Sequence, residues 1–92
     1  MPYSNKTVAA ISNAPKNLGS HLGRWAVRRD LSVLRVAKAL GVTRQTVYNW
    51  FIGGEIFPAY QTRAQRLLDI LQETHTADEA WKRICTEYNL TP

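Results

Sequence analysis

The sequence predicts an all-α fold, a compact bundle of about five helices. Apolar residues recur at intervals of three and four along most of the chain after residue 17, as in helices that bury one face. Residues that cap helices precede these segments, and glycine follows two of them. No stretch predicts a strand, because none alternates convincingly between apolar and polar residues.

The length of 92 residues limits the chain to one small domain, and 45% hydrophobic residues suffice for a helical core. Residues 1–16 are mostly polar and include Pro2 and Pro15, so we expect a flexible N-terminal arm. The domain itself is expected to span residues 17–90.

The first helix is expected from about Leu18 to Arg29, although Gly19 and Gly23 inside it disfavour a helix. Its apolar stripe predicts the buried face: Leu18, Leu22, Trp25 and Ala26.

A second helix, about Val33 to Leu40, is expected to start at the N-cap Ser32 and to stop at Gly41. Thr43 is a natural N-cap for a third helix, about Arg44 to Ile52, which Gly53 and Gly54 end.

A fourth helix, about 59–73, follows Pro58, which suits a helix entry. A fifth helix falls within residues 76–89, where Thr76 and Glu79 have the spacing of a capping box. Its apolar stripe could belong to the core of the single chain or to a dimer surface, with three residues as dimerisation candidates: Trp81, Ile84 and Tyr88.

Two short helices joined by a tight turn make up the segment VLRVAKALGVTRQTVYNWF, residues 33–51. This is the pattern of a helix-turn-helix, a DNA-binding unit whose second helix enters the major groove. Ala37 is small enough for close helix approach, and Gly41 permits the turn. Apolar residues are expected between the two helices and against the core: Val36, Leu40, Val42, Val47 and Trp50.

The outward face of the second motif helix carries Arg44, Gln45, Tyr48 and Asn49. Arginine can bond guanine through two hydrogen bonds, and glutamine or asparagine can bond adenine in the same way. We therefore predict these four side chains as base contacts. Phosphate contact remains the alternative for Arg44, and a solvent-facing position remains the alternative for Tyr48.

Residues 18–72 resemble the lambda-repressor-like helix-turn-helix domain of phage repressors, Cro proteins and related bacterial regulators. The segment LSVLRVAKALGVTRQTVYNWFIGG carries the resemblance through Ala37, the turn LGV, Val47 and Trp50. The resemblance implies base contacts by Arg44, Gln45 and Asn49, with Tyr48 beside them. It places Thr43 and Thr46 where the family often contacts phosphate or a thymine methyl group. The chain departs from many members at Val33, where they have a glutamine that touches phosphate.

The net charge of +5 favours an anionic partner, and the charge is uneven. From residue 16 to 66 only Asp30 and Glu55 oppose nine basic residues, whereas acidic residues dominate after residue 67. Within the basic part, Lys38, Arg35 and Arg63 are expected to be phosphate contacts or solvated charges.

We expect neither an enzyme nor a metal or cofactor site. The chain has one cysteine, Cys85, and no spacing of cysteine and histidine that suits zinc, and we find no nucleophile with a base. No apolar run is long enough for a membrane span, and the first residues do not predict a signal peptide, so a cytoplasmic location in a bacterium or phage-infected cell is expected.

The leading prediction is therefore a transcriptional regulator, a Cro-like repressor that binds a pseudo-palindromic double-stranded DNA operator as a homodimer. The alternative is a protein-interaction module, such as an antitoxin or a phage protein, that binds a protein partner through its acidic and apolar C-terminal third.

Overall fold

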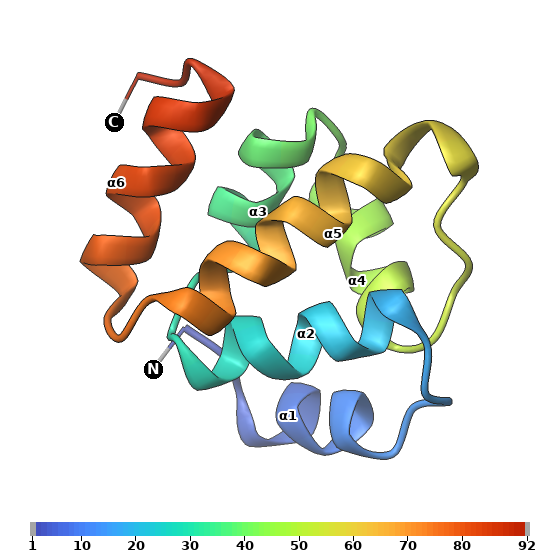
Figure 1. The fold of residues 1–92 in the computed structure, drawn as a ribbon. Helices are drawn as coiled ribbons and strands as arrows, with labels where there is room; N and C mark the ends of the chain where they lie inside the picture. Colours follow the sequence, from blue (N-terminus) through green and yellow to red (C-terminus); the bar gives the residue numbers. More distant parts are fainter. Residues whose placement is uncertain (1, 92) are drawn as a thin grey trace.

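The computed structural model describes residues 2–91, which form six helices and no strand (Figure 1). The predicted all-α class is confirmed, and the helix count is six instead of about five. The helices are α1 (Asn5–Ser12), α2 (Leu18–Arg28), α3 (Val33–Leu40), α4 (Arg44–Phe51), α5 (Pro58–Glu73) and α6 (Ala77–Tyr88). Helices α2 to α5 agree with the predicted boundaries to within one residue at each end.

Helix α2 lies at the centre of the arrangement and packs against α1, α4 and α5. In Figure 1, α1 covers the outer side of α2, whereas α6 lies at the opposite side of the molecule against α5 and α3. The pair α3 and α4 packs together, and Arg44, Gln45, Tyr48 and Asn49 of α4 are exposed. No helix within residues 2–91 is long and apolar enough to cross a membrane.

The extra helix corrects the prediction for the N-terminal segment, which we expected to be a flexible arm. Ser4 caps α1 by accepting a hydrogen bond from the backbone N–H of Thr7. Ile11 is buried, and so is Tyr3, whose hydroxyl donates to the carbonyl oxygen of Leu31 over 2.6 Å. Two apolar side chains thus attach the segment to the domain, although its overall composition is polar.

The predicted N-caps are observed at all three threonine and serine positions. Ser32, Thr43 and Thr76 accept hydrogen bonds from backbone N–H groups three residues later, at 3.1–3.2 Å. Thr76 and Glu79 form only this half of the predicted capping box within the described residues. Gly41 ends α3 in the left-handed conformation, with φ of 70°, as its position predicted.

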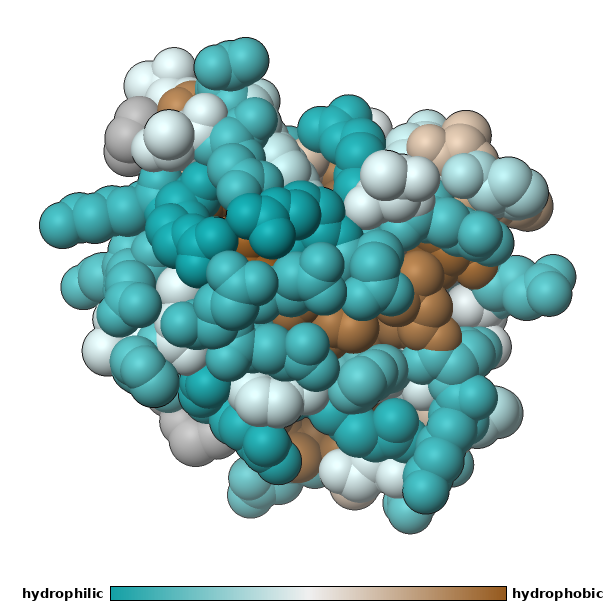
Figure 2. Space-filling model, in the orientation of Figure 1, coloured by the Kyte–Doolittle hydropathy of each residue, from teal (hydrophilic) through white to brown (hydrophobic). Residues whose placement is uncertain are grey.

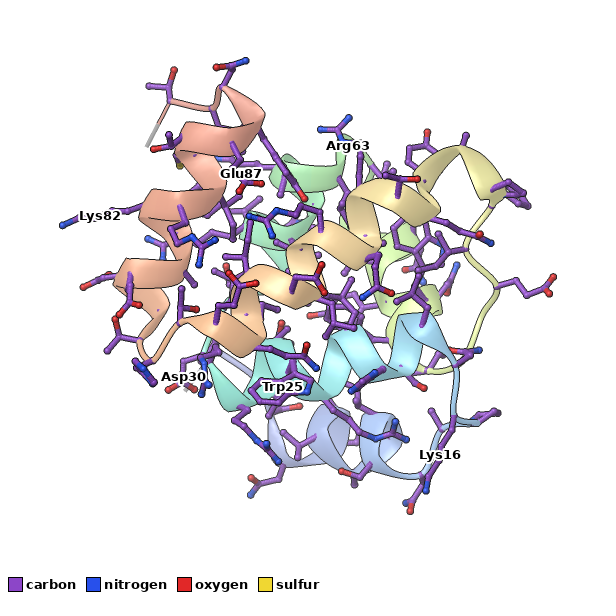
Figure 3. The ribbon with its side chains drawn as sticks, in the orientation of Figure 1. Lys16, Trp25, Asp30, Arg63, Lys82 and Glu87 are labelled. Carbon is purple, nitrogen blue, oxygen red and sulfur yellow. The ribbon has the colours of Figure 1, made fainter. Side chains whose placement is uncertain are left out.

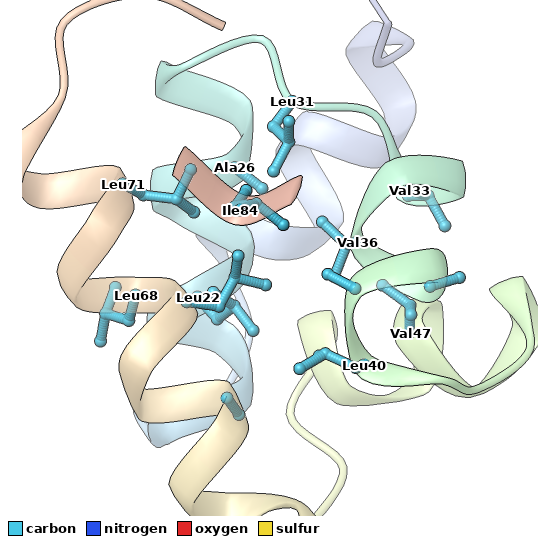
Figure 4. Close-up of a cluster of buried hydrophobic side chains, with 14 of the residues drawn as sticks. Leu22, Ala26, Leu31, Val33, Val36, Leu40, Val47, Leu68, Leu71 and Ile84 are labelled. Atoms are coloured by element: carbon cyan, nitrogen blue, oxygen red, sulfur yellow. The ribbon is translucent and has the colours of Figure 1, made fainter. Parts of the chain in front are cut away.

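The hydrophobic core lies between α2, α3, α5 and α6 (Figure 4). Ile84 of α6 points into the cluster that includes Leu22 and Ala26 of α2 and Leu71 of α5. Val36 and Leu40 of α3 and Val47 of α4 are also fully buried, as the helix-turn-helix pattern predicted for these positions.

Trp25 differs from the prediction of a core residue, because it is only half-buried. The guanidinium groups of Arg28 and Arg29 lie 4.6 Å and 5.0 Å from the centroid of its ring. Trp25 therefore forms an apolar platform for two cations at the surface of α2 (Figure 3).

The buried phenol of Tyr3 predicts a loss of stability at alkaline pH. Burial, and to a lesser degree the nearby Tyr48, raise the pKa of Tyr3 far above its ordinary value of 10. The folded state therefore keeps a proton that the unfolded state loses above pH 10, so the stabilisation is complete below pH 10 and declines above it. Between pH 9 and 11 this group should cost about 1 kcal/mol of the free energy of unfolding. Urea denaturation at both pH values should show a smaller decline for Tyr3→Phe than for the native chain, and equal declines would contradict the buried position.

Candidate nucleic-acid interface

The start of α4 is fixed by its cap and by the turn that precedes it. Gly41 directs the chain out of α3, and the backbone N–H groups of Gly41 and Val42 both bond to the carbonyl oxygen of Ala37. Thr43 then caps α4 through its Oγ1 atom. Ala37 is 5% exposed in α3, which packs against α4, so a larger side chain at this position would overpack the core.

The end of α4 is fixed by an unusually close approach to α2. A Cβ atom on Gly19 would lie 2.4 Å from the carbonyl oxygen of Trp50, and one on Gly23 would lie 2.8 Å from the ring of Phe51. The two glycines, four residues apart, form a smooth strip on α2. Helix propensity alone predicts only that the two glycines disfavour a helix, whereas their spacing of four residues is the signal for this contact.

This approach predicts that Gly19→Ala destabilises the fold, although alanine is the better helix former. The added Cβ would meet backbone atoms that cannot rotate away, so an overpacking cost of about 1–3 kcal/mol should exceed the gain of about 1 kcal/mol in helix propensity. Thermal unfolding of the variant measures the difference. A variant as stable as the native chain, or more stable, would show that α2 and α4 are further apart.

The outward face of α4 carries all four predicted base-contacting residues. Arg44, Gln45, Tyr48 and Asn49 are exposed, whereas Val47 and Trp50 are buried on the opposite side, as predicted. Trp50 packs against Tyr60 of α5, with ring centroids 5.7 Å apart. One face of an eight-residue helix is therefore committed to the core, and the other presents only polar side chains and a tyrosine.

Two of the exposed side chains are hydrogen-bonded to each other. The Nε2 atom of Gln45 donates to the Oδ1 atom of Asn49 over 3.1 Å. This bond uses one of the two N–H groups of the Gln45 amide and leaves its oxygen and one N–H free. An oxygen with an adjacent N–H is the pair that bonds adenine in the major groove. Asn49 keeps both of its own N–H groups free to donate, so both side chains can form further hydrogen bonds while they remain bonded to each other.

The two threonines at the start of α4 also form a pair. Thr43 Oγ1 and Thr46 Oγ1 are 3.0 Å apart, and the backbone N–H of Thr46 bonds to Thr43 Oγ1. One hydroxyl proton is used between the two oxygens, and the other remains free to donate. The backbone N–H groups of Arg44 and Gln45 at the first turn have no partner within residues 2–91. These donors suit an anion at the positive end of a helix.

The basic residues predicted to contact the DNA backbone separate into two groups. Lys38 is exposed, and no carboxylate pairs with it or with Arg44 within the described part of the chain. Arg35 is instead half-buried, and its guanidinium lies 5.0 Å from the ring centroid of Trp81 in α6. The guanidinium of Arg35 is thus engaged with a side chain of the protein itself, which counts against its predicted contact with the phosphate backbone.

Arg63 likewise contacts the protein. Its Nη2 atom donates to the carbonyl oxygen of Ala39 over 2.7 Å, and its guanidinium lies 5.3 Å from the ring centroid of Tyr88. The residue therefore binds a carbonyl near the C-terminal end of α3 and connects three helices. Sequence alone did not distinguish this role from that of a solvated charge.

The acidic residues that form ion pairs lie on α5 and α6, away from α4. Glu87 of α6, labelled in Figure 3, pairs with Arg66 of α5. Glu73 of α5 pairs with Arg83 of α6 over 2.9 Å. The bond to Arg66 holds the pKa of the Glu87 carboxyl below its ordinary value. The helices α3 and α4 contain no acidic residue, so the positive charge at α4 is not neutralised within this helix pair.

Two of the three residues considered for dimerisation belong to the core of the single chain. Ile84 is fully buried and Trp81 is 9% exposed, while Tyr88 is half-buried and donates its hydroxyl to the carbonyl oxygen of Arg63. The dimer role expected for Trp81 and Ile84 is therefore corrected to core packing. The reason is that α6 folds back across α3 and α5 and needs this stripe to attach itself.

Four large apolar side chains are exposed within residues 2–91, and the pattern of the sequence singled out only one of them, Tyr48. The four are Leu34, Tyr48, Ile52 and Phe57. Ile52 follows Tyr48 by one helical turn at the end of α4.

Comparison of the chain with models of protein families, with curated proteins and with solved structures gave no match.

Proposed function

We propose that the chain is a sequence-specific DNA-binding transcriptional regulator with a lambda-repressor-like helix-turn-helix formed by α3 and α4. The observation that carries the proposal is the exposed face of α4, where Arg44 and the Gln45–Asn49 pair stand on a capped helix. These side chains have the hydrogen-bonding groups that distinguish guanine and adenine in the major groove.

The geometry around α4 supports this proposal in two further ways. The start of the helix offers two free backbone N–H groups and one free threonine proton to a phosphate, which would fix the helix in the groove. The Thr43 cap fixes the start of α4, and the close contact of Trp50 with Gly19 of α2 fixes its end. A rigid helix is what selective base contacts require.

The size of the molecule supports binding as a homodimer to a pseudo-palindromic operator. Equivalent half-sites on one face of DNA lie about 34 Å apart, one helical turn. The principal extents of the chain are 32 × 29 × 21 Å, which is comparable with that spacing, so two copies fit beside each other on one face of the duplex. Because Trp81 and Ile84 are buried, the two copies would meet through other residues.

The alternative of a protein-interaction module is the weaker proposal. Its basis was the acidic and apolar character of the C-terminal third. Most of the apolar stripe is inside the core, and two of the acidic residues, Glu73 and Glu87, form ion pairs with arginines of the same chain. Co-purification of a stoichiometric protein partner that contacts α6 would restore it.

The experiment that tests the proposal is selection of bound duplexes from a random double-stranded pool. We expect enrichment of a two-fold symmetric site, with two chains per selected duplex by sedimentation. A pool that stays random after repeated selection, at a salt concentration where the protein still binds, would refute sequence-specific recognition.

Lys38 should contribute affinity but little specificity, because it is exposed on α3 and no carboxylate of the described chain pairs with it. Replacement by alanine should reduce the slope of log K against log salt by about 1, as expected for one lost phosphate contact. Fluorescence anisotropy over a range of salt concentrations measures this slope. Lys82→Ala is the matched control, because Lys82 is also exposed but extends from α6 (Figure 3) and should leave the slope unchanged. Equal slopes for both variants and the native chain would place the DNA away from α3.

A further inference from the structure

A cavity of about 340 Å³ lies between α1 and α2. It exists because the N-terminal segment forms a helix, and it is separate from the exposed face of α4. Its volume is at the lower end of the range for small-molecule sites. Three apolar side chains, one hydroxyl and two guanidinium groups line it: Val8, Ile11, Ser12, Arg24, Val27 and Arg28. In Figure 2 an apolar area surrounded by hydrophilic groups is visible over α1.

The lining of the cavity carries positive charge, because Arg24 and Arg28 belong to it and no acidic residue does. The first 29 residues contain five basic side chains and no acidic one: Lys6, Lys16, Arg24, Arg28 and Arg29. The ion pairs of the described chain involve only Arg66 and Arg83 as cations, so neither arginine of the cavity is neutralised by a carboxylate. Two adjacent guanidinium groups without a counter-charge favour an anionic ligand.

Both arginines are positioned by the protein and still have free donors. Arg24 is half-buried and donates to the carbonyl oxygen of Ala14 over 3.2 Å and to Ser20 Oγ over 3.4 Å. Arg28 is exposed; its guanidinium lies over the ring of Trp25 and makes no hydrogen bond within the described residues. A guanidinium has five N–H donors, so each group can still bind a carboxylate.

We propose that this cavity binds a small carboxylate with a short aliphatic chain, the carboxylate on Arg24 and Arg28 and the chain against Val8 and Val27. The apolar walls distinguish this ligand from a bare phosphate or a DNA backbone, which would use the positive charge and leave the walls in contact with water. One ligand that carries both a charge and an apolar chain matches both parts of the lining.

The test is a titration of the isotopically labelled protein with hexanoate, observed through its amide NMR signals. We expect saturable shifts at residues 8–12 and 24–28, with a Kd on the order of 1 mM for a ligand of this size. Acetate, which lacks the chain, and hexanamide, which lacks the charge, should bind at least tenfold more weakly. Arg24→Gln should weaken hexanoate at least tenfold, and Lys82→Gln should not change it.

Arg28→Gln provides a second variant, because Arg24 also contacts the segment that follows α1. It should weaken binding while the spectrum of the fold is retained. The proposal is overturned if hexanoate causes no saturable shift or shifts other residues, or if hexanamide binds as well. It is also overturned if inorganic phosphate or a DNA duplex binds at these residues as tightly as hexanoate does.

Discussion

Replacement of Phe51 by alanine should lower the free energy of unfolding by about 3–5 kcal/mol, the usual cost of removing a buried phenylalanine. Phe51 is fully buried at the end of α4, and its ring lies 6.5 Å from that of Tyr3 between centroids. It also fills the space that Gly23 leaves open on α2. One side chain thus connects α4, α2 and the N-terminal segment, so the cavity left by alanine could not close without moving three parts of the fold.

Urea denaturation measures this loss, and the chain provides its own control. Phe57 is 72% exposed, so the same replacement there should change the free energy of unfolding by less than about 0.5 kcal/mol. A double-mutant cycle with Gly23→Ala adds a test of the contact. The added Cβ atom would press on the ring of Phe51, so the cost of Gly23→Ala should fall when the ring has already been removed by Phe51→Ala. Additive costs would contradict the contact, and similar losses at positions 51 and 57 would contradict the burial.

The second large effect is expected at Gln45, in DNA binding. Gln45→Ala should weaken binding to the selected duplex by about 1–3 kcal/mol, roughly 5- to 150-fold, because a two-bond contact with a base is lost. Binding to an unrelated duplex should not change, since the exposed amide carries no charge. Fluorescence anisotropy on both duplexes gives the ratio.

Asn49→Ala tests the hydrogen bond between the two side chains at the same site. It removes the acceptor that holds the Gln45 amide, so it should lower the specificity ratio even where Asn49 touches no base. A control variant at Gln65 of α5, whose amide donates to Asp69 over 3.0 Å in the same helical geometry, should have no effect on either duplex. Equal losses on specific and unrelated DNA for Gln45→Ala would contradict base recognition by this side chain.

The helices from residue 18 onward were predictable because local chemistry determines their ends. Ser32, Thr43 and Thr76 cap helices in the structure as they were expected to, and Gly41 stops one. These effects act within a few residues of the chain, so composition and spacing reveal them.

Helix α1 was missed because tertiary contacts stabilise it. An isolated helix of eight residues is marginal in water, and only Tyr3 and Ile11 bury large apolar side chains in this segment. The partners of these two side chains are distant in sequence, as the bond from Tyr3 to Leu31 illustrates. A polar segment with two anchors has no periodic pattern that would distinguish it from a flexible arm.

The outward face of α4 was also predictable, whereas the roles of the arginines were not. Helical spacing predicts that Arg44, Gln45 and Asn49 all face away from the buried side of α4, which carries Val47 and Trp50. Arg35 and Arg63 have the same charge as Arg44, but one packs on an aromatic ring and the other binds a helix carbonyl. The partner of each guanidinium belongs to a helix that is distant in sequence, so it depends on the tertiary fold and cannot be read from local spacing.

The central claim is that α4 is the element that binds DNA, and mapping of the amide NMR signals tests it most directly. The labelled protein would be titrated with the selected duplex, or with a generic duplex at low salt if selection gives none. The largest shifts should fall on residues 43–49, with smaller ones at Lys38, and α6 should be unaffected. Shifts concentrated on α5 and α6, or none at concentrations where the complex forms, would contradict the claim.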